Sequence, residues 1–254
     1  MSAVPVLPVL PVLPVLPVLE VERIDTFRGP AHVLRSLSLV IGGGEAVCLV
    51  GRNGAGKTTT IESIMGLLPV KSGRITFKAR EITRLPAHER ARQGIGYSPE
   101  DAGIFPDLTV AENFQISRSL AASRGSSPAA GGDAEERVLG LFPEIKSFMQ
   151  RQGLNLSGGQ KKMVAITRAM LLSPSILLLD EPFEGLAPVV VSRFIDAAKQ
   201  IKAMGISLLI AESNLMTAAR VADRLYAIDR GEILFEGDPR SAFENVEVMR
   251  TIRG

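Results

Sequence analysis

The chain has 254 residues, 46% of them hydrophobic and 22% charged, which is enough to bury a core in one large domain or two small ones. Its 29 basic and 27 acidic residues leave a net charge of +2, and this balance argues against a surface that coats nucleic acid. The single cysteine, Cys48, excludes an internal disulfide, and one Cys with two His excludes the usual zinc sites.

Residues 1–18 form a low-complexity run in which proline recurs at every third position from Pro5 to Pro17. Proline removes backbone donors and blocks successive helical turns, so we do not expect a transmembrane helix here. We do not expect a signal peptide either, because no basic residue precedes the apolar run. We predict a disordered tail, or a misassigned start, before a folded domain at 19–254. A polyproline II ligand segment is the alternative.

Short apolar runs bounded by turn residues predict strands, and longer amphipathic runs predict helices. In chain order, strands are predicted at 19–24, 37–41, 45–50, 73–77, 95–98, 175–180, 206–211, 224–229 and 232–237. Helices are predicted at 57–68, 157–172, 188–204 and 214–222. The runs 46–50, 176–179 and 206–211 are apolar almost without interruption, which is typical of parallel strands covered on both faces. The alternation of strands and helices predicts a layered α/β domain.

The middle of the chain has a different pattern. Residues from about 103 to 172 are mainly helical, and Thr109 is a suitable N-cap for the first helix. We therefore predict a helical subdomain inserted into the α/β domain.

The stretch GRNGAGKTTT follows one predicted strand, precedes a helix and fits the phosphate-loop pattern G-x-x-x-x-G-K-[ST]. Its glycines let backbone N–H groups approach phosphate oxygens, and the helix N-terminus adds partial positive charge. Lys57 is expected to reach the β- and γ-phosphates, and the Thr58 hydroxyl to join a Mg²⁺ shell. The predicted ATP-binding residues of this loop are Gly51, Asn53, Gly54, Ala55, Gly56, Lys57, Thr58 and Thr59.

A second chemical signal is ILLLDE at 176–181. Asp180 ends an apolar strand, at the edge where α/β sheets bind ligands, and is predicted to hold Mg²⁺. Glu181 follows it and is suited to polarise the attacking water as a general base. The alternative is a strand that merely ends in acidic residues.

A third signal is LNLSGGQKK at 154–162, where Ser157, Gly158, Gly159 and Gln160 open a predicted helix. Exposed N–H groups and a hydroxyl make this turn a second anion site. The helical insertion separates it from the phosphate loop, so we predict that it closes on the nucleotide of a second subunit in a head-to-tail pair. The alternative is a helix N-cap without a ligand.

GRNGAGKTT, LSGGQ and ILLLDEP, in this order, resemble the ATP-binding subunits of ABC transporters over about residues 19–254. The resemblance implies an ATPase with an α/β P-loop NTPase fold of the ABC nucleotide-binding type. Such a fold has a mostly parallel sheet core, an N-terminal antiparallel β part and a helical insertion. It also implies a second ATPase subunit and two transmembrane permease subunits, through which alone the chain would meet the membrane.

Four further stretches, MGLLPVKSGRITF, ITRLPAHERARQGIGYSPE, IFPDLTVAEN and EGLAP, are similar to subunits that energise bacterial uptake of branched-chain amino acids, and to urea and amide importers. This similarity implies an external solute-binding protein and a place on the cytoplasmic face of the bacterial inner membrane. It leaves the solute undetermined.

Several positions depart from the family pattern. Glu100 replaces a common glutamine and is expected near Mg²⁺ or the water, and Ser213 replaces a histidine that contacts the γ-phosphate in many relatives. Phe183 stands where Ser or Thr is usual, and Phe27 or Arg28 would cover the adenine.

Three hypotheses remain. The first is an importer ATPase, the weaker half of an asymmetric pair with a paralogue. The second, which Ser213 and Phe183 favour, is a nucleotide-binding regulatory subunit with little hydrolysis of its own. The third is an export or a soluble, translation-associated ATPase of the same superfamily.

Overall fold

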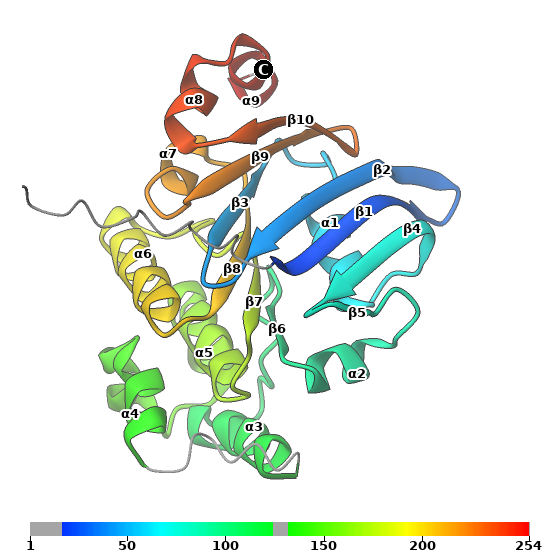
Figure 1. The fold of residues 1–254 in the computed structure, drawn as a ribbon. Coiled ribbons are helices and arrows are strands. Elements are labelled where there is room, and N and C mark those ends of the chain that lie inside the picture. Colours follow the sequence, from blue (N-terminus) through cyan, green and yellow to red (C-terminus); the bar gives the residue numbers. More distant parts are fainter. Residues whose placement is uncertain (1–16, 124–131, 254) are drawn as a thin grey trace, which may run out of the picture.

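The computed structural model describes residues 17–123 and 132–253, which form two β-sheets with helices packed against them (Figure 1). The larger sheet has the strand order β10-β9-β3-β8-β7-β6, and its strands are parallel except for β10, which is antiparallel to β9. Its strands are β3 (Ala46–Val50), β6 (Ile95–Ser98), β7 (Ile176–Asp180), β8 (Ser207–Glu212), β9 (Arg224–Asp229) and β10 (Glu232–Gly237).

The smaller sheet is antiparallel and has the order β2-β1-β4-β5. Its strands are β1 (Pro17–Arg28), β2 (Ala31–Gly42), β4 (Val70–Phe77) and β5 (Arg80–Glu81). β1 begins two residues before the predicted start of the folded domain at residue 19, since Pro17 pairs with Gly42 on β2 and Val18 O accepts a hydrogen bond from Lys78 N at 2.9 Å. Residues 1–16 of that tail lie outside the described residues.

The central strands are buried on both faces, which explains their uninterrupted apolar sequences. In β3, Cys48 and Val50 belong to a core cluster shared with α5 and α6. Val47 and Leu49 belong to a second cluster shared with α1 and the antiparallel sheet. Successive strand residues point to opposite faces, so one five-residue strand contributes to both cores.

Helices fill the remaining layers. They are α1 (Lys57–Met65), α2 (Ala87–Arg92), α3 (Val110–Ser123), α4 (Gly132–Gly140), α5 (Gly158–Met170), α6 (Pro188–Ala203), α7 (Leu215–Ala218), α8 (Pro239–Glu244) and α9 (Val246–Arg253). Two 3₁₀ turns, η1 (Pro143–Phe148) and η2 (Gly153–Asn155), lie between α4 and α5. In the sequence, α3, α4 and α5 come between β6 and β7, within the range predicted for the helical subdomain, and they lie together in the lower part of Figure 1.

Thr109 caps α3, as predicted. Its hydroxyl accepts from Glu112 N at 3.2 Å, and the Glu112 carboxylate accepts from Thr109 N at 2.8 Å. One turn further, buried Asn113 accepts from Phe105 N at 2.9 Å and donates to Phe105 O at 3.0 Å. The loop before α3 is therefore held to the helix by one amide side chain.

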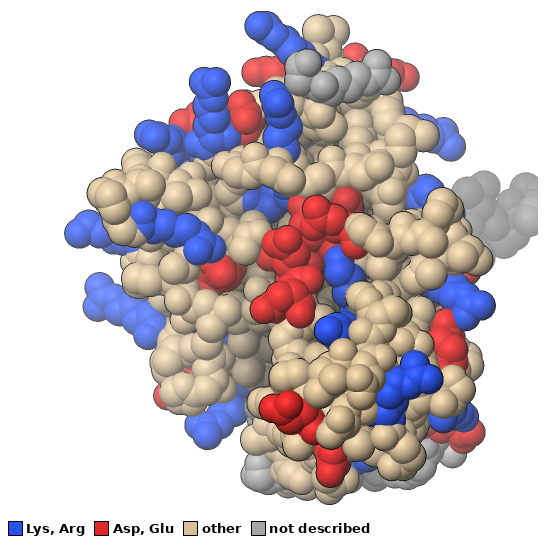
Figure 2. Space-filling model, turned by 180° about the vertical axis from the view of Figure 1, so that it is seen from behind, with Lys and Arg blue, Asp and Glu red and all other residues tan. Residues whose placement is uncertain are grey.

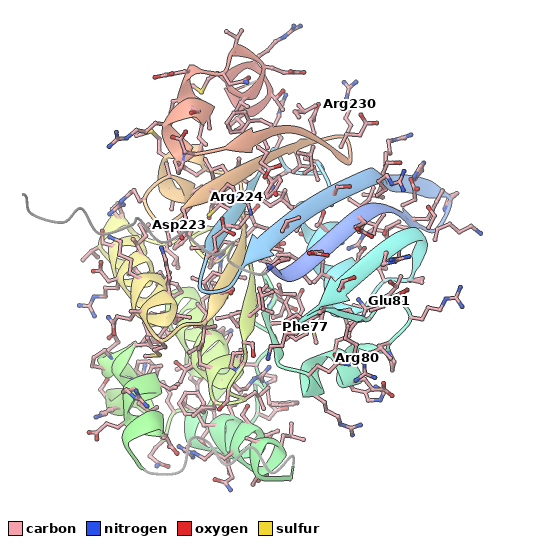
Figure 3. The ribbon with its side chains drawn as sticks, in the orientation of Figure 1. Phe77, Arg80, Glu81, Asp223, Arg224 and Arg230 are labelled. Carbon is pink, nitrogen blue, oxygen red and sulfur yellow. The ribbon has the colours of Figure 1, made fainter. Side chains whose placement is uncertain are left out.

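Arg224 at the start of β9 joins the two sheets (Figure 3). Its guanidinium contacts both carboxylate oxygens of Glu45, at 2.8 and 3.1 Å, and donates to Val40 O on β2 at 2.6 Å. These contacts with Glu45 raise the pKa of Arg224 further. A bidentate pair of this kind fixes geometry as well as adding energy.

The α/β fold with a mostly parallel core and an N-terminal antiparallel part is confirmed. Within residues 17–123 and 132–253, the longest apolar helices fall short of what a membrane span requires.

Candidate nucleotide site

The phosphate loop joins β3 to α1, and two of its positions require glycine for different structural reasons. A Cβ on Gly51 would lie 2.4 Å from Ile228 O, so this residue must lack a side chain for β3 to pack beside β9. Gly56 has a φ of 116° and is the N-cap of α1 without a side-chain hydrogen bond. The first N–H groups of α1 therefore face a position that an anion can fill.

Lys57, the first residue of α1, is only 5% exposed. Its ammonium donates to Gly51 O at 2.7 Å and to the Ser213 hydroxyl at 3.0 Å, and it lies 3.0 Å from Glu181 Oε1. The loop thus surrounds the Lys57 ammonium, which forms an ion pair with Glu181. A phosphate group entering the site competes with the Glu181 carboxylate for this ammonium.

Asp180 and Thr58 form the next pair. The Thr58 hydroxyl donates to Asp180 Oδ1 at 3.2 Å, while Oδ2 is buried with no hydrogen-bond partner in the described part of the chain. Burial raises the pKa of Asp180 to about 6, the Thr58 hydrogen bond lowers it, and the charge of Glu181 raises it. A buried carboxylate oxygen without a donor, beside a hydroxyl, fits a hard divalent cation such as Mg²⁺.

No group of three His, Cys, Asp or Glu residues in the described ranges has metal-ligand geometry. Mg²⁺ at a nucleotide site needs only one or two protein oxygens, since phosphate and water complete its shell. The pair formed by Thr58 and Asp180 therefore fits such a site, and Mg²⁺ binding there stays a prediction.

Glu181 follows β7 in the left-handed region, with a φ of 45°, and is 5% exposed. The Ser213 hydroxyl lies 2.6 Å from its Oε1, and Ser213 N donates to its Oε2 at 3.2 Å. The same hydroxyl lies 3.0 Å from Asn53 Oδ1. Strained backbone at an acidic residue held by two donors is typical of a functional position.

These residues surround one pocket of about 500 Å³. The lining residues are Arg28, Val33, Asn53, Gly54, Gly56, Lys57, Thr58, Thr59, Glu100, Glu181 and Glu184. Figure 2, seen from the side opposite Figure 1, shows acidic side chains gathered near the middle of that face with basic ones beside them. A lysine and helix N–H groups for phosphate, with carboxylates for a cation and a water, are what hydrolysis of a nucleoside triphosphate requires.

Comparison with known proteins supports the same chemistry. The profile of the family described as "ABC transporter" matches residues 34–184. The chain belongs to the ABC transporter family. It is therefore an ATP-binding subunit and an ATPase, and subunits of this family dimerise and work with transmembrane partners.

Three similar proteins illustrate the match. The lipopolysaccharide export system ATP-binding protein LptB of Acidithiobacillus ferridurans is 35% identical over 87% of this chain and 90% of its own length. A probable ABC transporter ATP-binding protein of Azorhizobium caulinodans is 37% identical over 89% of this chain and 79% of its own. A solved ATP-binding cassette of an ABC transporter, in its ADP conformation, has a TM-score of 0.81 and 27% identity, covering 94% of this chain and 99% of that one.

The structure brings most of the predicted site residues of this ATPase together. Asn53, Gly54, Gly56, Lys57, Thr58, Thr59, Glu100 and Glu181 line the pocket. Asp180 and Ser213 contact lining residues, and Gly51 accepts from Lys57. Ala55 is buried and accepts from Gly231 N at 2.9 Å, so it supports the loop from behind.

Phe27 lies outside this pocket. Its ring stacks on His32, with centroids 4.4 Å apart and planes 7° from parallel, and it lines another hollow with Val70 and Lys71. Arg28 lines the nucleotide pocket instead, and its Nε donates to the Thr59 hydroxyl at 3.1 Å. β-Strand alternation turns neighbouring side chains to opposite faces, so Phe27 and Arg28 line different hollows. The contact of either side chain with adenine stays a prediction.

The second anion turn also lies outside the pocket lining. Ser157 and Gln160 form a capping box at the start of α5: Ser157 Oγ accepts from Gln160 N at 3.3 Å, and Gln160 Oε1 accepts from Ser157 N at 3.0 Å. As an acceptor, the Ser157 hydroxyl keeps its proton for another partner. Its contact with a second subunit's nucleotide stays a prediction, as do the roles of Gly158 and Gly159.

Sequence reasoning missed two residues close to the Glu181 turn. Lys162 on α5 donates to Glu181 O at 2.5 Å and to Glu184 O at 3.1 Å, and burial lowers its pKa. Glu212, immediately before Ser213, is 3% exposed and accepts from Ser213 N at 2.9 Å. The available signal for Glu212 was an acidic residue ending a strand whose other residues are nearly all apolar.

Proposed function

We propose that this ATPase subunit powers an importer of branched-chain amino acids or related small solutes at the cytoplasmic face of the bacterial inner membrane. The hydrolytic part rests on one observation: Lys57, Thr58 and Glu181 line a single pocket of about 500 Å³, and Asp180 contacts Thr58 there. The import part rests on the stretches around the Glu100 turn and EGLAP, which are similar to uptake subunits.

The proposed hydrolysis uses the contacts of Lys57 and Glu181 described above. Lys57 leaves Glu181 for the β- and γ-phosphates of ATP, and this exchange frees the carboxylate to take a proton from water. The water oxygen then bonds to the γ-phosphorus as the bond to the bridging oxygen breaks, giving ADP and phosphate. Thr58 and Asp180 would hold Mg²⁺, which offsets phosphate charge when bound, and Glu100 lies at the same pocket.

The proposed assembly has two ATPase subunits, two transmembrane permease subunits and an external solute-binding protein. The Ser157–Gln160 turn of one subunit would close on the nucleotide of the other. Ser213 contacts both Lys57 and Glu181, yet it cannot supply an imidazole's charge, so we assign the chain to an asymmetric pair with a paralogue.

The test is reconstitution with the permease pair in proteoliposomes, comparing wild type with Glu181→Gln. The variant should bind ATP and lose turnover by about 10²–10⁴-fold, as expected for loss of a general base. Labelled leucine, urea and short amides, each with its binding protein, then identify the solute through ATP-dependent uptake. Equal ATP turnover by wild type and variant would contradict the role of Glu181.

Export is the second candidate, favoured by the 35% identity with LptB over 87% of the chain. The two directions differ in one measurement. In proteoliposomes with the ATPase on the outside, an importer moves a luminal solute out to the ATPase side, whereas an exporter moves an external solute into the lumen. Lipopolysaccharide release supported by this subunit would overturn the import proposal and leave the hydrolytic one intact.

A further inference from the structure

Glu212 is a buried acid to which the hydrolytic roles above assign no task. It ends β8, opposite Val50 in the parallel register, and its carbonyl accepts from Gly51 N at 3.3 Å. It is 3% exposed, and its Oε2 has no hydrogen-bond partner within the described ranges. Burying such a group is costly, so its presence at the junction of β8 and the phosphate loop requires a reason.

The other carboxylate oxygen holds a turn. Glu212 Oε1 accepts from Ser213 N at 2.9 Å and from Asn214 N at 3.0 Å. Asn214 in turn caps α7 by accepting from Thr217 N at 3.1 Å. Two successive N–H groups on one oxygen restrict the backbone of this turn from β8 to α7.

The turn carries the donors that hold the general base. Ser213 N is shared: it lies 2.9 Å from Glu212 Oε1 and 3.2 Å from Glu181 Oε2. The Ser213 hydroxyl lies 2.6 Å from Glu181 Oε1 and 3.0 Å from the Lys57 ammonium. Any displacement of the turn therefore displaces both contacts of the Glu181 carboxylate.

We propose that Glu212 is a positioning residue for ATP hydrolysis, which fixes the Ser213 turn and so holds the Glu181 carboxylate in its orientation at the pocket. The inference rests on the proposed role of Glu181 as general base. The proposal predicts different effects on ATP binding and on catalysis, because Glu212 does not line the pocket. Loss of Glu212 should impair catalysis while ATP binding by the phosphate loop continues.

The experiment compares Glu212→Ala, Glu212→Gln and Glu212→Asp with Glu232→Ala, a matched removal of an exposed acid on β10. Glu212→Ala should lower kcat about tenfold or more, because the Glu181 carboxylate is no longer held in its orientation. A tenfold loss corresponds to about 1.4 kcal/mol in the activation free energy. The Kd for ATP should stay within about twofold of wild type, because no group on the phosphate is removed. Glu232→Ala should match wild type in both.

The two conservative variants separate geometry from charge and remain informative if Glu212→Ala does not fold. Glutamine keeps an oxygen at the same reach and should restore kcat to within about threefold of wild type, because the acceptor is retained. Aspartate keeps the charge but is one methylene too short to reach both N–H groups, and it should remain slow. A glutamine variant slower than the aspartate variant would overturn the proposal.

A double-mutant cycle supplies a readout that a merely structural role would not change. In a Ser213→Ala background the hydroxyl contact with Glu181 is gone, so Glu212→Ala should lower kcat by a smaller factor than in wild type. An equal factor in both backgrounds, or a parallel loss of ATP affinity, would refute positioning through Ser213. Normal ATP turnover by Glu181→Gln would instead contradict the proposed role of Glu181 as general base, on which this inference rests.

Discussion

Replacing Glu212 by glutamine should change how the stability of the chain depends on pH. The pKa of Glu212 is raised from its ordinary 4.5 to about 7: burial raises it most and the charge of Glu181 adds to this, while hydrogen bonds from Asn214 and Ser213 lower it. A raised pKa means that the folded state holds the proton more tightly than the unfolded state. The associated stability is therefore present below about pH 4.5 and is lost as the pH rises through about 7.

The magnitude follows from the two pKa values. A difference of about 2.5 corresponds to about 3 kcal/mol once both states are ionised. Between pH 5 and pH 8 the linkage relation gives a loss of about 2.5 kcal/mol for wild type, and Glu212→Gln lacks this contribution. The constant cost of burying the amide cancels when the two pH values are compared.

Urea unfolding at pH 5 and pH 8, without nucleotide or magnesium, measures the effect. The stability of Glu212→Gln relative to wild type should improve by about 2.5 kcal/mol on going from pH 5 to pH 8. In thermal scans the same gain is about 5–10 °C for a chain of this size. Glu232→Gln is the control, because its exposed side chain should leave the two pH curves parallel. Parallel curves for Glu212→Gln would refute a buried, proton-holding carboxyl at this position.

Three further predictions concern the nucleotide. Lys57→Ala should weaken ATP binding by about 10–100-fold, which is the effect of losing one or two charge-assisted hydrogen bonds. Titration with a fluorescent ATP analogue measures this, and an unchanged Kd would contradict the prediction. Arg28→Ala should weaken ATP binding more than Phe27→Ala, because Arg28 lines the pocket; the reverse order in the same titration would place the base against Phe27. Ser157→Ala should cost about 1 kcal/mol in urea unfolding by removing the cap of α5, and no change would mean that the capping box is absent in solution.

The phosphate loop and the acidic strand end could be predicted because each is a continuous stretch with its own local geometry. GRNGAGKTTT and ILLLDE carry strand, turn and ligand in consecutive residues, so neighbouring structure adds little to what they specify. Thr109 was predictable for the same reason, since its capping partner Glu112 is three residues away.

Other features depend on contacts between distant segments. The helix predicted at 157–172 is largely present as α5, whereas the helix predicted at 214–222 shortens to α7 at Leu215–Ala218. The short helix α2 is held by the buried guanidinium of Arg90. That side chain donates to carbonyls of Ser63, Ile64, Thr83 and Leu85 at 2.7–2.8 Å. The sequence pattern of a six-residue helix cannot predict hydrogen bonds to carbonyl groups in distant segments.

The choice between Phe27 and Arg28 is of the same kind. Both are suitable for covering a base by residue type, and the sequence alone ranks neither. Strand alternation in β1 and the stacking of Phe27 on His32 decide which of them faces the phosphate loop.

The charges of the residues at the pocket explain why a magnesium-bound nucleotide is expected there. Glu100, Glu181 and Glu184 line the pocket, and Asp180 lies directly behind Thr58, whereas Lys57 and Arg28 are the basic residues among those that line it. A free triphosphate entering this site would meet more carboxylates than cations, so its charge must be offset by a bound divalent cation before its phosphates displace Glu181 from Lys57. Burial is the largest cause of the raised pKa of Asp180, about 6, and the charges of Glu181 and Glu100 add to it. A pocket with more carboxylates than cations therefore favours the magnesium-bound nucleotide over the free one. On the proposed mechanism, the displaced carboxylate of Glu181 is then available to take a proton from water.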